Sequence, residues 1–374
     1  ELGLNYIGPI DGHDIDELMT VIGNLKDFEG PQFLHVITKK GAGLDPAEAD
    51  RIGFHAIGKI KPLDATNKKN GPKYQDVFGQ WIVDMAKEDE ELMAITPAMR
   101  EGSGLVNFSK EFPERFYDVA IAEQHAVTLA AGMACEGKKP VVAIYSTFLQ
   151  RAYDQLIHDV ALQNLNVLFA IDRAGLVGED GPTHSGNYDL TYLRCIPNMI
   201  IAVPADENET RKLLTTAFLH QGPVAVRYPR GCGINSQIDP ELKPLEIGKG
   251  RLINKRESEV IVINFGALFG IAEKVAQELE ATLIDMRFVK PLDEVLLAEH
   301  TKAKKIIVTI EDGAISGGAG SAVNEWAQEN NIKAQTIICG IPDEFIEHAS
   351  REEMIEMAGL DANSIIAKVK KYLP

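Results

Sequence analysis

Between residues 74 and 230, short apolar runs with the length of buried strands alternate with segments whose apolar residues have helical spacing. The runs lie at 92–96, 139–145, 166–172, 199–204 and 224–230. This alternation is typical of a parallel sheet that is covered by helices on both faces. We therefore predict an α/β fold with a doubly wound parallel sheet in this part of the chain.

The regions on either side show the same alternation. A strand at 4–8, a helix at 15–25 with Asp14 as its N-cap, and a strand at 32–38 predict one βαβ unit. Apolar runs at 260–264, 281–285, 306–310 and 334–339 predict a further parallel sheet. Polar stretches at 61–73 and 232–246 are expected to be linkers, which gives three domains at 1–60, 74–231 and 247–374.

The first domain contains too few strands for a complete sheet, and the chain does not begin with Met. We therefore expect that an N-terminal part of the protein precedes these residues. The net charge of −17 argues against a general nucleic-acid or anionic-membrane surface. The 4 cysteines are scattered without a CxxC pair, which argues against a zinc site and favours a reduced, cytoplasmic setting. Cys135 is expected in the core.

The segment from Asp118 to Ala126 carries an unusually placed acid. Its apolar part, residues 119–122, is predicted to be a strand that delivers Glu123 to the start of a small-residue helix at 126–134. Glu123 could be a cofactor or substrate ligand. It could equally be an acid that is favourably placed near the positive end of a helix.

Other chemically active residues follow the predicted strands, where the carboxyl ends of a parallel sheet converge on one crevice. They are Tyr145, Phe148, Arg151, Arg173, Asp180, His184 and Arg230. Arg151 would lie in the first turn of a helix expected at 149–160. Each alone could be a solvated loop residue. Together, arginines for a phosphate or carboxylate, an acid and a histidine for proton transfer, and a flat aromatic ring predict a ligand site.

Three other segments allow both a functional and a structural interpretation. Residues 39–43, Lys-Lys-Gly-Ala-Gly, follow a predicted strand and could bind a phosphate through Lys40, or could form a solvated turn. His55 lies in a loop and could be ordinary polar surface. Residues 317–320, Gly-Gly-Ala-Gly, lack the spacing of a dinucleotide fingerprint, so close helix–strand packing is the preferred interpretation.

Several stretches together resemble the 1-deoxy-D-xylulose-5-phosphate synthase family, which comprises thiamine-diphosphate enzymes of the transketolase superfamily. The resemblance extends from residue 8 to the last helix and is carried by the segments 8–14, 95–104, 118–125, 145–154, 172–184, 227–231, 285–293 and 317–321. It implies a homodimer with diphosphate-binding, pyrimidine-binding and C-terminal domains. It also implies decarboxylative condensation of pyruvate with glyceraldehyde 3-phosphate, whose product feeds isoprenoid, thiamine and pyridoxal synthesis.

The resemblance also implies roles for individual residues. Glu123 would hydrogen-bond the aminopyrimidine, Phe148 would stack on it, and Lys40 would approach the diphosphate. Arg173 and Arg230, with Tyr145 and Arg151 nearby, would bind the phosphate of the aldehyde. His55, Asp180 and His184 would orient oxygens and transfer protons.

The family's Gly-Asp-Gly…Asn motif, which holds Mg2+ and the diphosphate, does not occur in these 374 residues. We therefore expect no metal ligand here and expect the metal site in the missing N-terminal half. Two alternatives stay open. The chain could be the beta subunit of a 2-oxoacid dehydrogenase decarboxylase component, although residues 1–60 would have no place there. It could also be a non-catalytic fragment.

Overall fold

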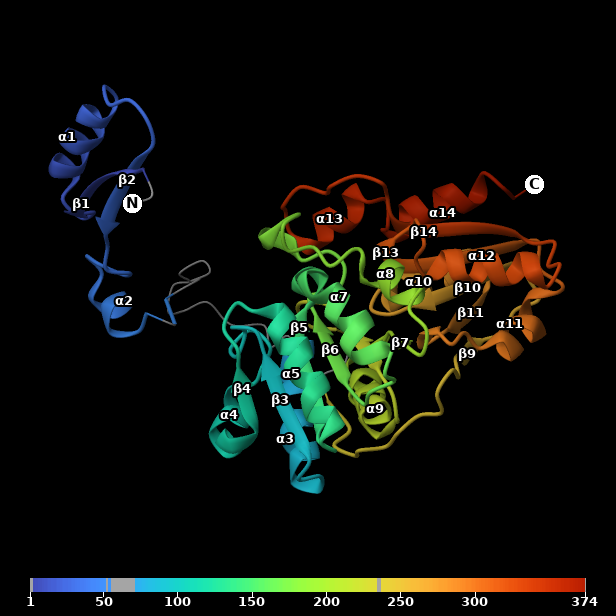
Figure 1. Ribbon diagram of the computed structural model, residues 1–374. Coiled ribbons are helices and arrows are strands. Elements are labelled where there is room, and N and C mark those ends of the chain that lie inside the picture. Colours follow the sequence, from blue (N-terminus) through green and yellow to red (C-terminus); the bar gives the residue numbers. More distant parts are fainter. Residues whose placement is uncertain (1–2, 52, 55–70, 234–236, 374) are drawn as a thin grey trace. The chain divides into compact units, whose positions relative to one another are not determined.

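The computed structural model describes residues 3–51, 53–54, 71–233 and 237–373. The chain divides into two compact units, residues 1–69 and residues 70–374 (Figure 1). The predicted linker at 61–73 lies mostly outside the described residues. The described parts of the second linker, 232–233 and 237–246, contain no helix and no strand, apart from an isolated β-bridge between Cys232 and Lys73.

The first unit is the predicted βαβ arrangement. Strands β1 (Asn5–Asp11) and β2 (Gln32–Ile37) are parallel, and helix α1 (Ile15–Leu25) connects them. Asp14 caps α1 by accepting a hydrogen bond of 2.9 Å from the Glu17 amide. A short helix, α2 (Asp45–Ala49), follows. The unit buries little apolar surface, since its exposed large side chains are Leu4, Tyr6, Ile15, Met19, Ile22, Phe28, Phe33, Ile37 and Leu44.

The second unit contains a seven-stranded sheet in the order β12-β7-β8-β6-β5-β3-β4. Six strands are mutually parallel: β3 (Leu92–Thr96), β4 (Phe116–Asp118), β5 (Lys139–Tyr145), β6 (Leu168–Asp172), β7 (Ile200–Ala202) and β8 (Val224–Arg227). Strand β12 (Phe288–Lys290) comes from much later in the chain and pairs antiparallel with β7. The predicted doubly wound parallel sheet is confirmed.

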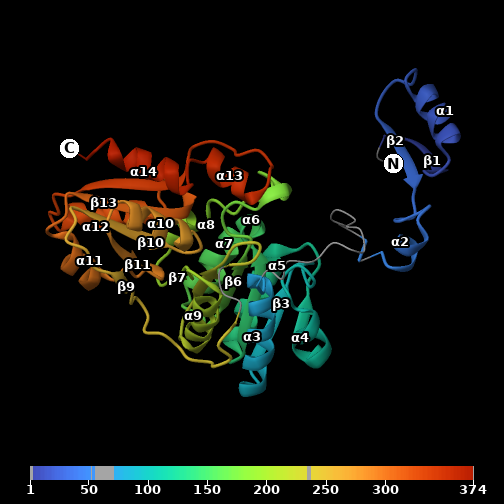
Figure 2. The same ribbon diagram turned by 180° about the vertical axis from the view of Figure 1, so that it is seen from behind.

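Helices cover both faces of this sheet. Helices α3 (Tyr74–Glu88), α4 (Val106–Glu111) and α9 (Glu207–Leu219) share one apolar cluster with the sheet. Helix α5 (Glu123–Cys135), the segment that follows β5 and helix α8 (Asp189–Arg194) share the other. Helices α5 and α7 lie in front of the sheet in Figure 1, and α3 lies in front of it in the reverse view of Figure 2.

Three local predictions were wrong. Residues 119–122 do not form a strand. The strand β4 ends at Asp118, Ala120 has a left-handed φ of 57°, and helix α5 already begins at Glu123. The helix expected at 149–160 is instead a succession of short turns: α6 (Ser146–Leu149), a 3-10 turn, α7 (Tyr153–Gln155) and a π-helical stretch (Leu156–Ala161). Cys135 is exposed, because it ends α5 on the solvent side.

The second sheet of this unit has five strands in the order β14-β13-β10-β11-β9. They are β9 (Arg251–Asn254), β10 (Val260–Phe265), β11 (Thr282–Asp285), β13 (Ile306–Ala314) and β14 (Gln335–Ile341), and only β9 is antiparallel to its neighbour. The accompanying helices are α10 (Phe269–Glu278), α11 (Glu294–Thr301), α12 (Ala319–Glu329), α13 (Arg351–Met357) and α14 (Ala362–Lys370).

Close packing explains the glycine-rich segment before α12. A Cβ on Gly320 would overlap the Thr309 hydroxyl, and a Cβ on Gly318 would overlap a Glu311 carboxylate oxygen. The glycines thereby let Glu311 accept hydrogen bonds of 2.7 Å from the Ala319 and Gly320 amides. Burial nevertheless raises the pKa of Glu311 to about 8, against the opposing effect of these amides.

The two sheets are joined by a buried ion cluster as well as by β12. Arg227, at the end of β8, contacts Asp189 of α8 at 2.8 Å and Asp312 of β13 at 2.5 Å, and all three side chains are buried. Burial lowers the pKa of Arg227, but the two carboxylates outweigh this effect and raise it. The same apolar cluster continues from α5 and α8 into β10, β11 and α12. The two halves of the unit therefore share one core.

We expect Arg227→Met to lower the free energy of unfolding by about 3–5 kcal/mol, because two buried carboxylates would lose their only cationic partner among the described residues. Urea denaturation of the whole chain measures this change. The control is Lys305→Met, which breaks an exposed pair with Glu259 and should cost about 0–1 kcal/mol. Equal stabilities of the two variants would contradict a structural role for the cluster.

Candidate functional site

Glu123 is held at the beginning of α5 with its side chain almost fully buried. Its relative exposure is 3%, and its Oε1 atom lies 2.6 Å from Nη1 of Arg151. The guanidinium of Arg151 and the positive end of helix α5 both place positive charge beside this carboxylate. The hydrogen bond from Arg151 goes to Oε1, not to the second oxygen, Oε2.

The stacked rings of Tyr145 and Phe148, here called the aromatic shelf, lie beside this ion pair. Tyr145, the last residue of β5, stacks on Phe148 with ring centroids 5.6 Å apart and an interplanar angle of 8°. His184 meets the Phe148 ring edge-on at 5.6 Å. The Arg151 guanidinium lies 5.2 Å from the centroid of the same ring. Phe148 lies in the short helix α6 and Arg151 in the 3-10 turn that follows it, and Arg151 links the Phe148 ring to Glu123.

Arg173 organises the other side of the shelf. Its Nη1 atom donates to Asp172 at 2.5 Å, to the Gly102 carbonyl at 2.8 Å and to the Gln75 side chain at 3.0 Å. Its guanidinium carbon lies 4.2 Å from the centroid of the Tyr145 ring. Arg173 has a left-handed φ of 57°, which is uncommon for a residue other than glycine. A Cβ on Gly102 would overlap the Tyr145 hydroxyl, so this ring requires a glycine there.

Burial shifts two ionisation equilibria at this point. It raises the pKa of Asp172 to about 6, although the neighbouring Arg173 opposes the shift. It also raises the pKa of Tyr145 to about 12, so the phenol stays protonated at neutral pH. Asp172, Gln75 and Gly102 did not figure among the predicted site residues. Only Asp172 had a recognisable signal, because it is a charged residue that ends an apolar strand.

Arg230 has a more exposed guanidinium with carboxylate partners. Its Nη1 atom lies 2.6 Å from Asp180 and 3.6 Å from Glu179, and it donates to the Val177 carbonyl at 2.9 Å. Asp180 ends a 3-10 turn, Gly178–Asp180, in the loop that leads to His184. The hydroxyl oxygen of Thr183 lies 2.9 Å from Nδ1 of His184. The side chain of Arg230 is 36% exposed, so a soluble anion can compete with Asp180 for it.

The structure therefore brings most of the predicted site residues together within the second unit: Glu123, Tyr145, Phe148, Arg151, Arg173 and His184 are linked by successive contacts, with Arg230 and Asp180 as an adjoining pair. Lys40 belongs to the first unit, and His55 lies outside the described residues. In the ranges that the structure describes, no three His, Cys, Asp or Glu side chains are grouped to hold a metal ion.

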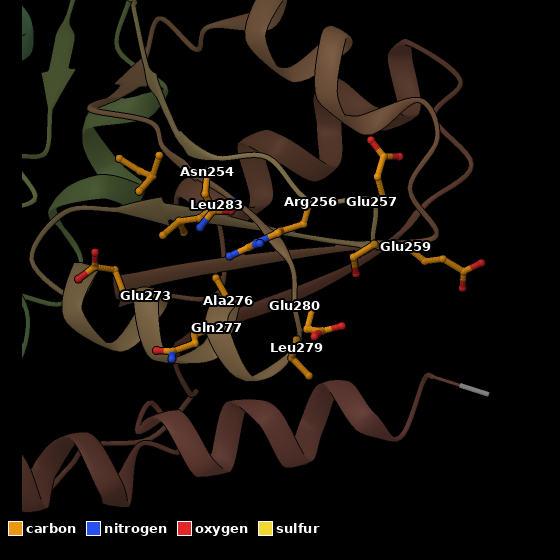
Figure 3. Close-up of a pocket in the computed structure, with 12 residues that line it drawn as sticks. Asn254, Arg256, Glu257, Glu259, Glu273, Ala276, Gln277, Leu279, Glu280 and Leu283 are labelled. Carbon is orange, nitrogen blue, oxygen red and sulfur yellow. Dashed lines mark hydrogen bonds between the residues drawn. The ribbon is translucent and has the colours of Figure 1, made fainter.

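A cavity of about 890 Å³ lies elsewhere, beside β9, β11 and α10 (Figure 3). Its charged lining consists of Arg256 and four glutamates, Glu257, Glu259, Glu273 and Glu280. It contains no aromatic shelf and no histidine. Size alone therefore does not identify the functional site, and the arrangement around Glu123 has the more specific chemistry. No helix in the described part of the chain has the length and apolar character needed to cross a bilayer.

Family models match three consecutive regions of the chain. Residues 1–38 match the model described as 1-deoxy-D-xylulose-5-phosphate synthase. Residues 70–233 match the transketolase pyrimidine binding domain, and residues 248–365 match the transketolase C-terminal domain.

Individual relatives agree with these matches. The chain is 60% identical over 374 residues to a 1-deoxy-D-xylulose-5-phosphate synthase of Pseudomonas aeruginosa and 62% identical over 375 residues to that of a Marinomonas species. It spans 60% of the length of each of these relatives.

Among solved structures, a split-gene transketolase described as an inactive beta4 tetramer has a TM-score of 0.72 and 30% identity. The match covers 80% of this chain and 98% of that one. A transketolase from Campylobacter jejuni shares the fold, with a TM-score of 0.65 at 17% identity; that match covers 99% of this chain and 67% of that one.

The raised pKa of Asp172 leads to a pH prediction. Between the ordinary carboxyl value of 3.8 and about 6, the folded protein holds a proton that the unfolded chain releases. The contribution of this group to the free energy of unfolding is therefore greatest below pH 3.8 and is lost as pH rises to about 6.

We expect the stability of the wild type relative to Asp172→Asn to fall by up to about 3 kcal/mol between about pH 4 and pH 7, measured by urea denaturation. Asp89, whose pKa is lowered mainly by Lys139 against the effect of burial, provides a control of opposite sign. Relative to Asp89→Asn, the wild type should become more stable as pH rises. A difference for Asp172→Asn that does not change with pH would contradict the prediction.

Proposed function

The chain belongs to the transketolase family, and we propose that it forms the C-terminal part of a 1-deoxy-D-xylulose-5-phosphate synthase. The proposed reaction condenses pyruvate with glyceraldehyde 3-phosphate and releases CO2. The match at residues 1–38 and the 60% identity to synthases support this assignment over a general transketolase or a 2-oxoacid dehydrogenase subunit. The product would feed isoprenoid, thiamine and pyridoxal synthesis in the cytoplasm.

Three domains follow from this proposal. Residues 1–60 would be the tail of the diphosphate-binding domain, 74–231 the pyrimidine-binding domain and 247–374 the C-terminal domain. The incomplete βαβ unit with exposed apolar faces agrees with the first assignment. The rest of that domain, with the Mg2+ ligands, would come from residues outside this chain, and the complete protein would be a homodimer.

The residues around Glu123 fit the pyrimidine end of thiamine diphosphate. The buried carboxylate has an oxygen, Oε2, that accepts no hydrogen bond from Arg151, and Arg151 links this carboxylate to the Phe148 ring. A carboxylate and an aromatic face are the combination that a flat, basic heterocycle needs. When bound, thiamine diphosphate supplies the electron sink for decarboxylation of a 2-oxo acid. Glu123 would hold a proton at a ring nitrogen, and Phe148 would stack on the ring. Lys40 of the first unit would approach the diphosphate.

Two arginines would bind the phosphate of the aldehyde. Arg230 is partly exposed, and its carboxylate partner Asp180 can give way to a dianion. Arg173 uses Nη1 for its contacts, and among the described residues none accepts a hydrogen bond from its Nη2. The Tyr145 ring packs against one face of the Arg173 guanidinium. Arg151 would act on the cofactor side, because its contacts are to Glu123 and Phe148.

His184 would transfer a proton, and Asp180 would orient the acceptor substrate. The condensation leaves a hydroxyl on the carbon of the former aldehyde, so its oxygen must gain a proton. His184 lies at the edge of Phe148 and has an imidazole suited to proton transfer near neutral pH. Asp180, on the same loop, would orient the acceptor, and His55 would be a further proton donor.

A second candidate function is a chain without catalytic activity of its own. A split-gene transketolase that matches 80% of this chain, over 98% of its own length, is described as an inactive beta4 tetramer. Intact-mass measurement under native conditions distinguishes the candidates. Assemblies of this 374-residue species alone, without turnover, favour the second candidate, and a companion polypeptide or a heavier chain favours the first.

Glu123→Gln in the complete enzyme should lower kcat at least about a hundredfold, because an amide cannot gain and lose a proton at the pyrimidine. Formation of 1-deoxyxylulose 5-phosphate measures the effect. Glu91→Gln, which changes an exposed acid paired with Lys138, serves as the control and should leave turnover unchanged. Near-native turnover of Glu123→Gln would show that the assigned role is wrong.

Arg230→Ala should raise KM for glyceraldehyde 3-phosphate about tenfold or more and leave KM for pyruvate within about twofold, since a charge-assisted contact to the phosphate is lost. Initial rates with each substrate varied in turn separate the two constants. Arg256→Ala, at the second sheet, is the matched arginine control. An unchanged KM for the aldehyde would remove Arg230 from the phosphate site.

A further inference from the structure

Gln75 is the second residue of α3, and no motif pointed to it. Its Oε1 atom accepts a hydrogen bond of 3.0 Å from Nη1 of Arg173, which lies 98 positions later in the chain. The same nitrogen donates to the Gly102 carbonyl and to Asp172. Three oxygens from three separate segments thus fix one end of a single guanidinium group.

The charges of these three acceptors differ in a way that matters for anion binding. Only Asp172 can carry a negative charge, and burial raises its pKa to about 6. Gln75 and the Gly102 carbonyl hold Arg173 in place without adding charge. A carboxylate in place of Gln75 would keep the hydrogen bond but would compete with an incoming phosphate for the same cation.

The hydrogen bonds to Nη1 also set the orientation of the whole Arg173 guanidinium. Its side chain is only 11% exposed, and the Tyr145 ring covers one face of the guanidinium. Nη1 is used by the three oxygens, and no described residue accepts a hydrogen bond from the other amino group, Nη2, which is therefore the group left for a ligand. Without Gln75, the guanidinium could rotate toward Asp172 and withdraw that group.

We propose that Gln75 is a positioning residue that sets the preference of the site for a phosphorylated aldehyde over an unphosphorylated one. This inference rests on the proposed function, in which Arg173 binds the phosphate. Gln75 acts by fixing the direction of the Arg173 guanidinium and by leaving its positive charge available. It does not itself contact the reacting carbon atoms.

The experiment compares Gln75→Leu and Gln75→Glu in the complete enzyme, with glyceraldehyde 3-phosphate and with unphosphorylated glyceraldehyde as acceptors. Gln75→Leu removes a hydrogen bond to a charged group and should raise KM for the phosphorylated acceptor about tenfold. Gln75→Glu retains the bond but should raise this KM at least as much. For unphosphorylated glyceraldehyde, kcat/KM should stay within about twofold.

Gln80 on the same helix provides matched controls. It is exposed and bonds only to Asp84 among the described residues, at 2.8 Å, so Gln80→Leu and Gln80→Glu should leave both acceptors unaffected. Equal losses with both acceptors in the Gln75 variants would assign Gln75 a merely structural role and overturn the proposal. Native KM values in Gln75→Glu would also overturn it, because that variant keeps the shape of the wild-type side chain.

Arg173→Ala separates this inference from the proposed function. If Arg173→Ala does not reduce the preference for the phosphorylated acceptor, the phosphate assignment fails and the role of Gln75 fails with it. If Arg173→Ala abolishes the preference while the Gln75 variants retain it, only the role of Gln75 is wrong. Loss of the preference in both, with thermal unfolding midpoints unchanged, supports the proposal.

Discussion

The buried contact of Arg227 with Asp189 and Asp312 is the constraint on which the site most depends. It joins the end of β8 to α8 and to the second sheet, and Arg227 also donates to the Gly186 carbonyl at 3.3 Å. Gly186 ends the loop that carries Asp180 and His184. Because buried charges tolerate little displacement, this contact fixes the loop against the sheet. The C-terminal half of the unit thereby shapes a site to which it contributes no predicted catalytic side chain.

Pairing of opposite charges explains how so many ionisable groups can coexist in a partly buried crevice. Each acid around the shelf has an arginine partner: Glu123 has Arg151, Asp172 has Arg173 and Asp180 has Arg230. The solvent exposure of each ion pair decides whether its arginine can exchange the carboxylate for another anion. The Asp172–Arg173 pair is buried and resists exchange, whereas the Arg230 pair is accessible to solvent and can exchange a carboxylate for a phosphate.

The two units differ in how much of their apolar surface each one buries. The second unit has three buried apolar clusters, whereas in the first unit helix α1 has no buried residue. A two-stranded sheet with one helix cannot bury both of its faces. This chain spans 60% of the length of the relatives that it matches. In the proposed function, the remainder of such a protein would cover these faces and would supply the diphosphate half of the cofactor site.

The sequence by itself determined the α/β class, most strands and the residues that follow them, because apolar periodicity is a local property of the chain. Tyr145, Phe148 and His184 were among those residues and are linked by contacts in the structure, whereas Glu123 was singled out although residues 119–122 do not form the predicted strand. It did not reveal β12, the broken helix after β5 or the exposed position of Cys135, because each depends on packing against distant segments. Only the tertiary structure decided that Arg151 pairs with Glu123 and that Gln75 holds Arg173. Partners that lie 28 and 98 positions apart are set by strand order, which local patterns do not encode.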